Sequence, residues 1–535
     1  MVSGRSGAAK SSRIGRGMCH GVYRGVRVGV VLILVSLLAW VALAQSSANV
    51  LRAAVPVDPE TIDPHIGANT VHSVWMALVY ETLIALDKNG DPAPGLAESW
   101  TISEDGTVYT FNLRDDVRWH NGRALVAEDV KFNLERIQNP DVGATQTGQL
   151  SPIVDIQTPD ESTVVLTLDA SNAAILSEIG VQGRVGLAAP EAFDADGNLL
   201  TPIGTGPFTL APEDYIVNDS LRLQTNEDYW RGRATIDGID LVVIPDNLAR
   251  LIAVSSGDVD FAWDVPGLQA TFEAQAGNIN LQEVITNESN WLSLNTQNPK
   301  LADPRVRRAL LLAMSRNDIV AAGWNGFATP VFQPFVESSF WHVDIPSQRN
   351  DARMEEAQAL LEEAGVSSGD ITMTILSWDA SGTQMEAEVV ASAWTQLGVR
   401  TSVESIDTAS MLDRATRNDF DAIYAFVAFV YDPNRPYNYF NQNWNLNGLS
   451  GGLQSEALTS LFEQGQQTSD PDTRREIYGQ LVNSMYEDEP SFIYTVRKSS
   501  FVALSPQVEG YTQGNLLAVS YAEGEGIMSL SLGGN

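Results

Sequence analysis

The sequence has almost no cysteine. Cys19 is the only one in 535 residues, and it lies in an N-terminal segment that we expect to be removed. The rest of the chain can therefore form no disulfide, no cysteine-based zinc site and no thiol nucleophile. No cysteine follows the one long apolar run, so the sequence offers no site for a lipid-anchored mature end.

Histidine is scarce as well. After residue 44 the chain has only His65, His72, His120 and His342, and no two are four residues apart, the spacing of a helical zinc site. The segment GLSGG (448–452) matches the pattern of a hydrolase nucleophile elbow, but the polar residues before it do not predict the buried strand that an elbow needs. We therefore expect no catalytic residues, no metal and no cofactor.

Basic residues are few compared with acidic ones. The chain has 33 Lys and Arg against 67 Asp and Glu, which gives a net charge of −34. Removal of residues 1–44 would take away six basic residues and no acid, and would bring the net charge to −40. Nucleic-acid binding depends on cationic contacts to phosphate, so we expect no nucleic-acid partner. The same charge argues against anionic membrane surfaces.

Acidic residues are absent before Asp58, and the N-terminus instead carries basic residues followed by the apolar run Val28–Ala44. The run ends in Ala42-Leu43-Ala44. This order is typical of a secretory signal peptide, which we expect over residues 1–44 with cleavage after Ala44. A retained membrane anchor is the alternative, because 17 residues are just enough to span about 30 Å of hydrocarbon. We expect an exported, extracytoplasmic and soluble protein.

The clearest structural unit lies between residues 371 and 431. It reads as strand 371–377, helix 384–397, strand 399–406, helix 409–418 and strand 421–431, and the last strand is almost wholly apolar. A continuous apolar run indicates a strand covered on both faces. The order β-α-β-α-β predicts parallel strands joined by right-handed crossovers. In the helix, Met385, Val389, Ala393 and Leu397 form the predicted buried face.

A second unit of the same kind lies earlier, with a strand at 239–244, a helix at 247–257 and a strand at 258–263. Further helices are predicted at 70–84, 303–320 and 351–365. The segment GTGPF (204–208) is interpreted as a turn with glycine at positive φ. Alternating elements of this kind indicate an α/β protein.

Both units end in an aromatic residue followed by an acid, Trp263-Asp264 and Tyr431-Asp432. Ligands of open α/β sheets bind beyond the carboxyl ends of the strands. Rings supply apolar contact area, and a carboxylate can hold an ammonium or a hydroxyl group. A turn before Pro433 would explain Asp432 equally well. The candidate ligand-binding residues are Asp432, Tyr431, Phe429, Trp378, Trp263, Trp444, and Asn69 and Thr70 at a helix start.

Beyond these features, the chain resembles a known family over nearly all of the sequence after residue 44. The segments that carry the resemblance are LRAAVPVDPETIDPH (51–65), residues 79–132, GTGPF, NEDYWRG, IPDNLARLIAVSSGDVDF and LSLNTQNPKLADPRVRRAL, in that order. They are similar to the extracytoplasmic solute-binding proteins of ABC importers, in the family that includes the dipeptide- and oligopeptide-binding proteins (family 5).

The resemblance implies a type II periplasmic-binding-protein fold, with two α/β lobes joined by hinge strands. Lobe I would comprise residues 48–285 with an extra subdomain at about 85–200, lobe II residues 286–492, and the tail 493–535 would return to lobe I. It further implies ABC permease and ATPase subunits as partners. We expect a monomer that binds a small solute between its lobes.

The resemblance also bears on the ligand. Peptide-binding members have an Asp, three residues before the Asp-Pro of a D-x-x-D-P-like motif, that holds the peptide's amino group. Aligned on Asp432-Pro433, this chain has Phe429 there. The ligand is therefore left open between a peptide and an oligosaccharide or other non-peptide solute. A secreted α/β hydrolase, and a receptor or chaperone outside transport, are the competing functions.

Overall fold

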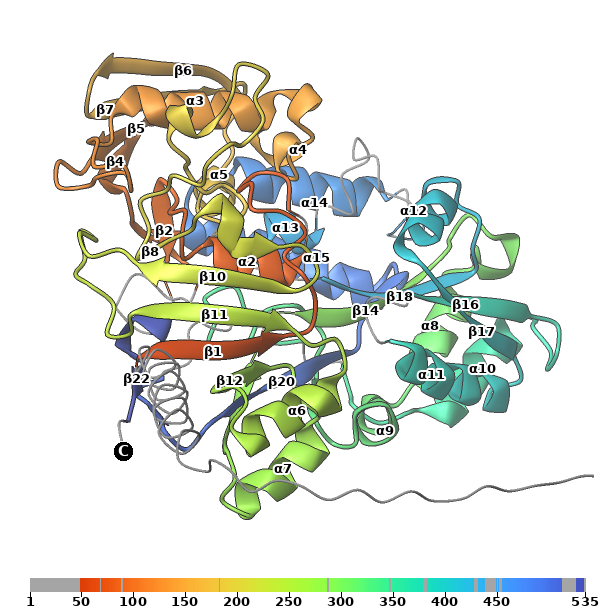
Figure 1. Ribbon diagram of the computed structural model, residues 1–535. Helices are drawn as coiled ribbons and strands as arrows, with labels where there is room; N and C mark the ends of the chain where they lie inside the picture. Colours follow the sequence, from red (N-terminus) through yellow and green to blue (C-terminus); the bar gives the residue numbers. More distant parts are fainter. Residues whose placement is uncertain are drawn as a thin grey trace, which may run out of the picture. The chain divides into compact units, whose positions relative to one another are not determined.

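The computed structural model describes residues 49–67, 69–87, 90–181, 183–285, 288–345, 348–378, 383–427, 432–437, 449, 451, 455–511 and 526–533. Residues 49–535 form one compact unit (Figure 1). The predicted signal peptide, with Cys19, lies outside the described residues. Within the described part of the chain, no helix is both long enough and apolar enough to cross a membrane.

The largest sheet has nine strands among the described residues, in the order β13-β20-β12-β1-β11-β10-β8, with β15 added beside β20 and β9 beside β10. The strands are β1 (Val50–Val55), β8 (Phe208–Thr209), β9 (Tyr215–Ile216), β10 (Ser220–Thr225), β11 (Gly238–Val243), β12 (Phe261–Trp263), β13 (Asn280–Ile285), β15 (Ala328–Pro330) and β20 (Val496–Leu504). β11 and β12 both pair with β1 in parallel, as the second predicted unit requires.

The nine-stranded sheet is covered on both faces. Leu51, Ala53 and Val55 of β1 join one core with helix α2 (Thr70–Met76). Ala54 points to the opposite face and joins a second core with helices α6 (Asn247–Ser256) and α7 (Gly267–Gln275). This alternation is the period of two expected along a strand.

A second sheet has the order β17-β16-β18-β14-β19. Its strands are β14 (Ser289–Leu294), β16 (Thr372–Trp378), β17 (Arg400–Ile406), β18 (Ala422–Val427) and β19 (Phe492–Tyr494). β16 pairs in parallel with both β17 and β18, which confirms the β-α-β-α-β prediction (Figure 1). The helices around it are α8 (Pro304–Ala313), α9 (Arg316–Asp318), η5 (Ile319–Gly323), α10 (Met354–Glu363), α11 (Gln384–Gln396), α12 (Thr408–Thr416), α13 (Asn434–Tyr437), α14 (Glu456–Gln467) and α15 (Pro471–Glu487).

A third sheet, with the order β4-β5-β7-β6, falls within the predicted extra subdomain. Its strands are β4 (Ala97–Ile102), β5 (Val108–Leu113), β6 (Ile153–Asp160) and β7 (Thr163–Leu168). Helices α3 (Ala127–Gln138), α4 (Thr147–Leu150) and α5 (Ile175–Ile179) contribute to its core. Smaller elements are β2 (Ile84–Leu86) with β3 (Pro92–Pro94), and β21 (Val508–Glu509) with β22 (Ser531–Leu532).

Among the described strands, four connections pass between the nine-stranded and five-stranded sheets: β13 to β14, β14 to β15, β15 to β16, and β19 to β20. The connection from β19 to β20 is the single residue Thr495. The N–H of Thr495 donates to the carbonyl O of Asn290 over 3.0 Å, so this connection lies beside the start of β14. We call Asn290 and Thr495 the crossover pair. The lobe boundaries inferred from the sequence stay a prediction.

The helix predicted at 70–84 is wrong in its length. Its N-cap is Asn69, but the helix ends at Met76. The carbonyl groups of Leu78 and Val79 instead accept hydrogen bonds from the N–H groups of Phe208 and Gly206, each over 3.0 Å. Tertiary pairing of these backbone groups replaces the helical bonds that the apolar spacing predicted.

Those contacts also correct the interpretation of GTGPF. Neither Gly204 nor Gly206 has a positive φ. A Cβ at Gly204 would overlap the carbonyl O of Val79, and one at Gly206 would overlap that of Leu78. Glycine is required here because two backbone segments approach closely. The predicted reason for these glycines, a positive φ in a turn, is wrong.

Candidate ligand-binding site

Asp432 is buried and is held by an arginine. It follows β18 after residues 428–431, which lie outside the described residues, and only 4% of it is exposed. Its Oδ1 accepts from Nη2 of Arg474 over 2.6 Å, and its Oδ2 accepts from Nη1 of the same residue. Oδ1 also accepts from the backbone N–H of Asn434 over 2.8 Å. Both carboxylate oxygens are therefore engaged within the protein.

Arg474 links this carboxylate to the surrounding helices. It lies in α15, and its Nε donates to the carbonyl O of Gly465 in α14 over 2.8 Å. Its guanidinium lies 5.0 Å from the ring centre of Trp341 and 5.3 Å from that of Tyr478. Burial alone would lower the pKa of Arg474, but the ion pair with Asp432 raises it. The ligand-binding role of Asp432 stays a prediction.

A second buried acid lies close to this ion pair. Glu178 of α5 is 5% exposed, and its Oε2 lies 4.0 Å from Nη1 of Arg435 in α13. Burial raises the pKa of Glu178 to about 7; the charge of Arg435 opposes that shift and the charge of Asp432 adds to it. The segment just before α5 also contacts α14, because the N–H of Ala173 donates to the carbonyl O of Gln466 over 3.1 Å. The region of α5, which packs in the core of the third sheet, therefore contacts α13 and α14 beside the five-stranded sheet.

Trp378 pairs with an aromatic ring of the neighbouring strand. It is the last residue of β16, it is half-buried, and it stacks on Phe426 of β18 with ring centres 5.1 Å apart and planes 20° apart. Phe426 is half-buried as well. This stacked pair lies at the carboxyl ends of two parallel strands, where an α/β sheet binds its ligand.

The remaining described candidates have structural partners of their own. Trp263 is 6% exposed and lies in the core of the nine-stranded sheet. Asn69 accepts from the N–H of His72 over 2.7 Å and donates to the carbonyl O of Asp58 over 2.9 Å. Thr70, next to it, is half-buried. Their contact with a ligand stays a prediction. Tyr431, Phe429 and Trp444 lie outside the described residues.

The histidines serve the fold. His65, His72 and His120 are buried, and burial lowers the pKa of each to about 4. Each ring lies within hydrogen-bond distance of a backbone carbonyl, that of Gly186, Asp63 and Gly206 respectively. Among the described residues, no group of three or more His, Cys, Asp or Glu side chains could hold a metal ion.

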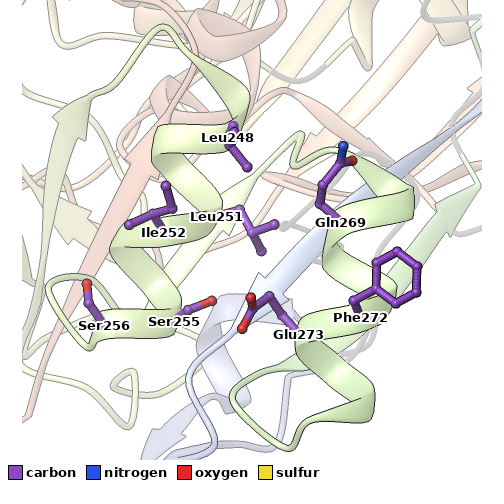
Figure 2. A pocket seen from close by; sticks show the side chains of 8 residues that line it. All are labelled: Leu248, Leu251, Ile252, Ser255, Ser256, Gln269, Phe272 and Glu273. Carbon is purple, nitrogen blue, oxygen red and sulfur yellow. The ribbon is translucent and has the colours of Figure 1, made fainter.

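A hollow of about 430 Å³ lies elsewhere, between helices α6 and α7 (Figure 2). Leu248, Ile252 and Phe272 line it, and their side chains are substantially exposed to solvent. None of the predicted site residues lines it. The stacked rings at the carboxyl ends of β16 and β18 stay the candidate site.

Comparisons with known proteins identify the family. The model of the bacterial extracellular solute-binding proteins, family 5, matches residues 91–450. The dipeptide-binding protein of Escherichia coli K12 is 26% identical over 524 residues, which cover 90% of this chain and 96% of that protein.

Two solved structures have the same fold. The substrate-binding protein CtaP of Listeria monocytogenes superposes with a TM-score of 0.79 at 22% identity, covering 91% of this chain and 100% of the other. AgaA of A. tumefaciens R10, in complex with agropinic acid, has a TM-score of 0.76 at 26% identity, covering 91% and 99%. The periplasmic-binding-protein fold expected from the sequence is confirmed, and the chain belongs to the bacterial extracellular solute-binding proteins of family 5.

Proposed function

We propose that this protein captures one small solute between the part built on the nine-stranded sheet and the part built on the five-stranded sheet, and delivers it to the permease of an ABC importer. The family match over residues 91–450 carries this proposal. The single-residue connection at Thr495 and the short connection from β13 to β14 support it, because short segments between two sheets can act as hinges for closure around a ligand.

The ligand is proposed to be a solute without a free N-terminal ammonium group. Phe429 stands where the peptide-binding members have a carboxylate. Asp432 is a poor substitute, because Arg474 already contacts both of its oxygens. The stacked rings of Trp378 and Phe426 suit the apolar face of a sugar or another neutral group. The structure of AgaA in complex with agropinic acid shows that a protein of this fold can hold a ligand other than a peptide.

A peptide ligand is the second candidate. The E. coli dipeptide-binding protein matches 90% of this chain, which favours a peptide. The two candidates differ in the charge they need from the site: a peptide brings an ammonium that requires an anion, and a neutral solute does not.

A thermal-shift screen of the protein without residues 1–44 tests the proposal. The probes are dipeptides, opines, oligosaccharides and metal chelates. A true ligand at 100 times its dissociation constant stabilises the protein by about 2.7 kcal/mol. We expect a shift from an opine or an oligosaccharide and none from dipeptides. Stabilisation by dipeptides alone would reverse the order of the two candidates.

We further propose that binding involves no conversion of the solute. The competing hydrolase would need a nucleophile or a metal beside the stacked rings, and its clearest sequence pattern, GLSGG, lies largely outside the described residues. Incubation of the stabilising ligand with the protein, followed by mass spectrometry, separates the two functions. Recovery of a cleaved ligand would favour the hydrolase.

A further inference from the structure

Glu386 is a fully buried acid at the centre of a hydrogen-bond network. It lies in the first turn of α11 and is 0% exposed, and none of the predicted site residues that the structure describes is hydrogen-bonded to it. Its Oε1 accepts from Nε1 of Trp324 over 2.7 Å and from Nδ2 of Asn290. Its Oε2 lies 2.6 Å from the hydroxyl of Tyr424.

The network continues from Glu386 to the crossover pair. The hydroxyl of Tyr424 lies 2.7 Å from Oγ1 of Thr495. Oγ1 of Thr495 in turn lies 3.2 Å from the carbonyl O of Asn290. Three oxygen–oxygen contacts therefore run in series from the carboxyl group to the crossover pair.

Counting protons shows which form of Glu386 fits this series. Three contacts need three protons, but the two hydroxyl groups supply only two. With a proton on Oε2, Glu386 donates to Tyr424, Tyr424 donates to Thr495, and Thr495 donates to the carbonyl O of Asn290. Oε1 is then the carbonyl-type oxygen that accepts both N–H donors. All three oxygen–oxygen contacts carry a hydrogen only in this protonated form.

Ionisation would change the last contact. A carboxylate at Glu386 accepts a hydrogen bond from the hydroxyl of Tyr424, which keeps its proton. The contact between Tyr424 and Thr495 then carries a hydrogen only if the hydroxyl of Thr495 turns to donate to Tyr424. The hydroxyl bond from Thr495 to Asn290 is lost, and the crossover pair keeps only its backbone bond of 3.0 Å.

From this geometry we infer that Glu386 is a proton-operated lock on the crossover between the two sheets: its neutral form ties Thr495 to Asn290 by two hydrogen bonds, and its charged form by one. This goes beyond solute capture, since it assigns the hinge a dependence on pH.

The groups that face Glu386 place this change near neutral pH. Burial raises the pKa of Glu386 to about 7, while hydrogen bonds from Tyr424, Trp324 and Asn290 and the charge of Lys498 in β20 act against the rise. Lys498 is itself 3.7 Å from Glu288. Burial raises the pKa of Tyr424, and the positive charge of Arg316 in α9 opposes that rise.

The charged groups on the other elements that pack on α11 are engaged elsewhere. Arg307 and Arg308 of α8 form ion pairs with Glu489 and Glu487. On β17, Arg400 donates to Thr372 and Glu404 pairs with Arg414, and on α11 itself Glu388 accepts from Gln384. The folded protein holds the proton of Glu386 more tightly than the unfolded chain does, in which the pKa of this side chain is near 4.5. The stabilisation by Glu386 is therefore complete below about pH 4.5 and is lost as the pH rises through about 7.

Hydrogen exchange at the crossover tests the inference without any ligand. We expect the protection factor of the Thr495 amide, measured relative to intrinsic exchange, to fall about 2- to 10-fold between pH 6 and 8 in the wild type, as loss of one hydrogen bond predicts. Glu386→Gln fixes the neutral pattern, because the amide N–H₂ can donate to Tyr424 while the amide oxygen accepts from Asn290 and Trp324. Its protection factor should change less than 2-fold.

A second variant separates the relay from the charge. Thr495→Val removes the last hydroxyl and leaves Glu386 to titrate, so the pH dependence of the melting temperature should remain while that of the crossover exchange disappears. Equal pH profiles in the wild type and Glu386→Gln would overturn the inference. If Glu386→Gln does not fold, a pH-dependent protection factor retained in Thr495→Val would overturn it instead.

Discussion

Replacement of Asp432 by alanine is expected to lower the free energy of unfolding by about 3–5 kcal/mol. The substitution leaves Arg474, which is 3% exposed, as a buried charge without its carboxylate. It also removes the acceptor of the Asn434 N–H at the start of α13. Urea denaturation of the protein without residues 1–44 measures the loss.

The Asp413–Arg417 pair provides the matched control. Its side chains are 62% and 58% exposed, and Asp413 of α12 lies four residues before Arg417, the C-cap of that helix. Asp413→Ala should cost at most about 0.5 kcal/mol. Removing both charges of the buried pair, by Asp432→Leu with Arg474→Met, should cost less than Asp432→Ala alone. A loss for Asp432→Ala as small as that for Asp413→Ala would contradict the structural role of the ion pair.

This result would change the meaning of a binding assay on Asp432. The sequence predicts that Asp432→Ala weakens ligand binding and leaves the fold intact. The ion pair adds a stability cost, so weakened binding by this variant would not by itself place Asp432 against the ligand. Affinity must be compared at a temperature where the variant is fully folded.

Trp394→Ala is expected to destabilise the protein by about 3–5 kcal/mol. Trp394 is 0% exposed, lies in the core of the five-stranded sheet, and donates from Nε1 to the carbonyl O of Leu310 in α8 over 2.9 Å. The truncation would open a cavity between α11 and α8 and leave that carbonyl without this donor. The midpoint of chemical denaturation should fall accordingly.

Met385 on the same helix is the control. It is 52% exposed, although the sequence pattern placed it on the buried face. Met385→Ala should change stability by no more than about 0.5 kcal/mol. A cost for Met385→Ala similar to that for Trp394→Ala would mean that α11 buries the face predicted from the sequence.

The helix α11 shows what the sequence could predict and what it could not. Its existence and its end before Gly398 follow from local pattern and are confirmed. Of the predicted buried face, Leu397 is buried, but Met385 is exposed and Val389 and Ala393 are only half-buried. The face that the helix buries lies one position away and consists of Glu386, Ala387, Val390, Ala391 and Trp394. The pattern assigned a glutamate to the surface, whereas partners from three other segments satisfy this one in the interior.

The candidate site was less predictable for the same reason. The position of Asp432 near the end of a central strand follows from the apolar run before it. Its partner Arg474 lies 42 residues further along the chain. Glu178, in the N-terminal half of the chain, lies close to Arg435, three residues after Asp432. Such long-range pairings leave no periodic signal in a single sequence. The stacking of Trp378 on Phe426 was only partly predictable: Trp378 directly follows the predicted strand 371–377, whereas Phe426 lies within the predicted strand 421–431.

The central claim is that a solute is captured by closure of two parts of one chain and is released unchanged. Small-angle X-ray scattering of the protein, with and without a saturating amount of the ligand that stabilises it most, tests this directly. We predict a smaller radius of gyration in the complex, with one intact ligand molecule recovered per chain. A converted ligand, or tight binding with no compaction, would contradict the account.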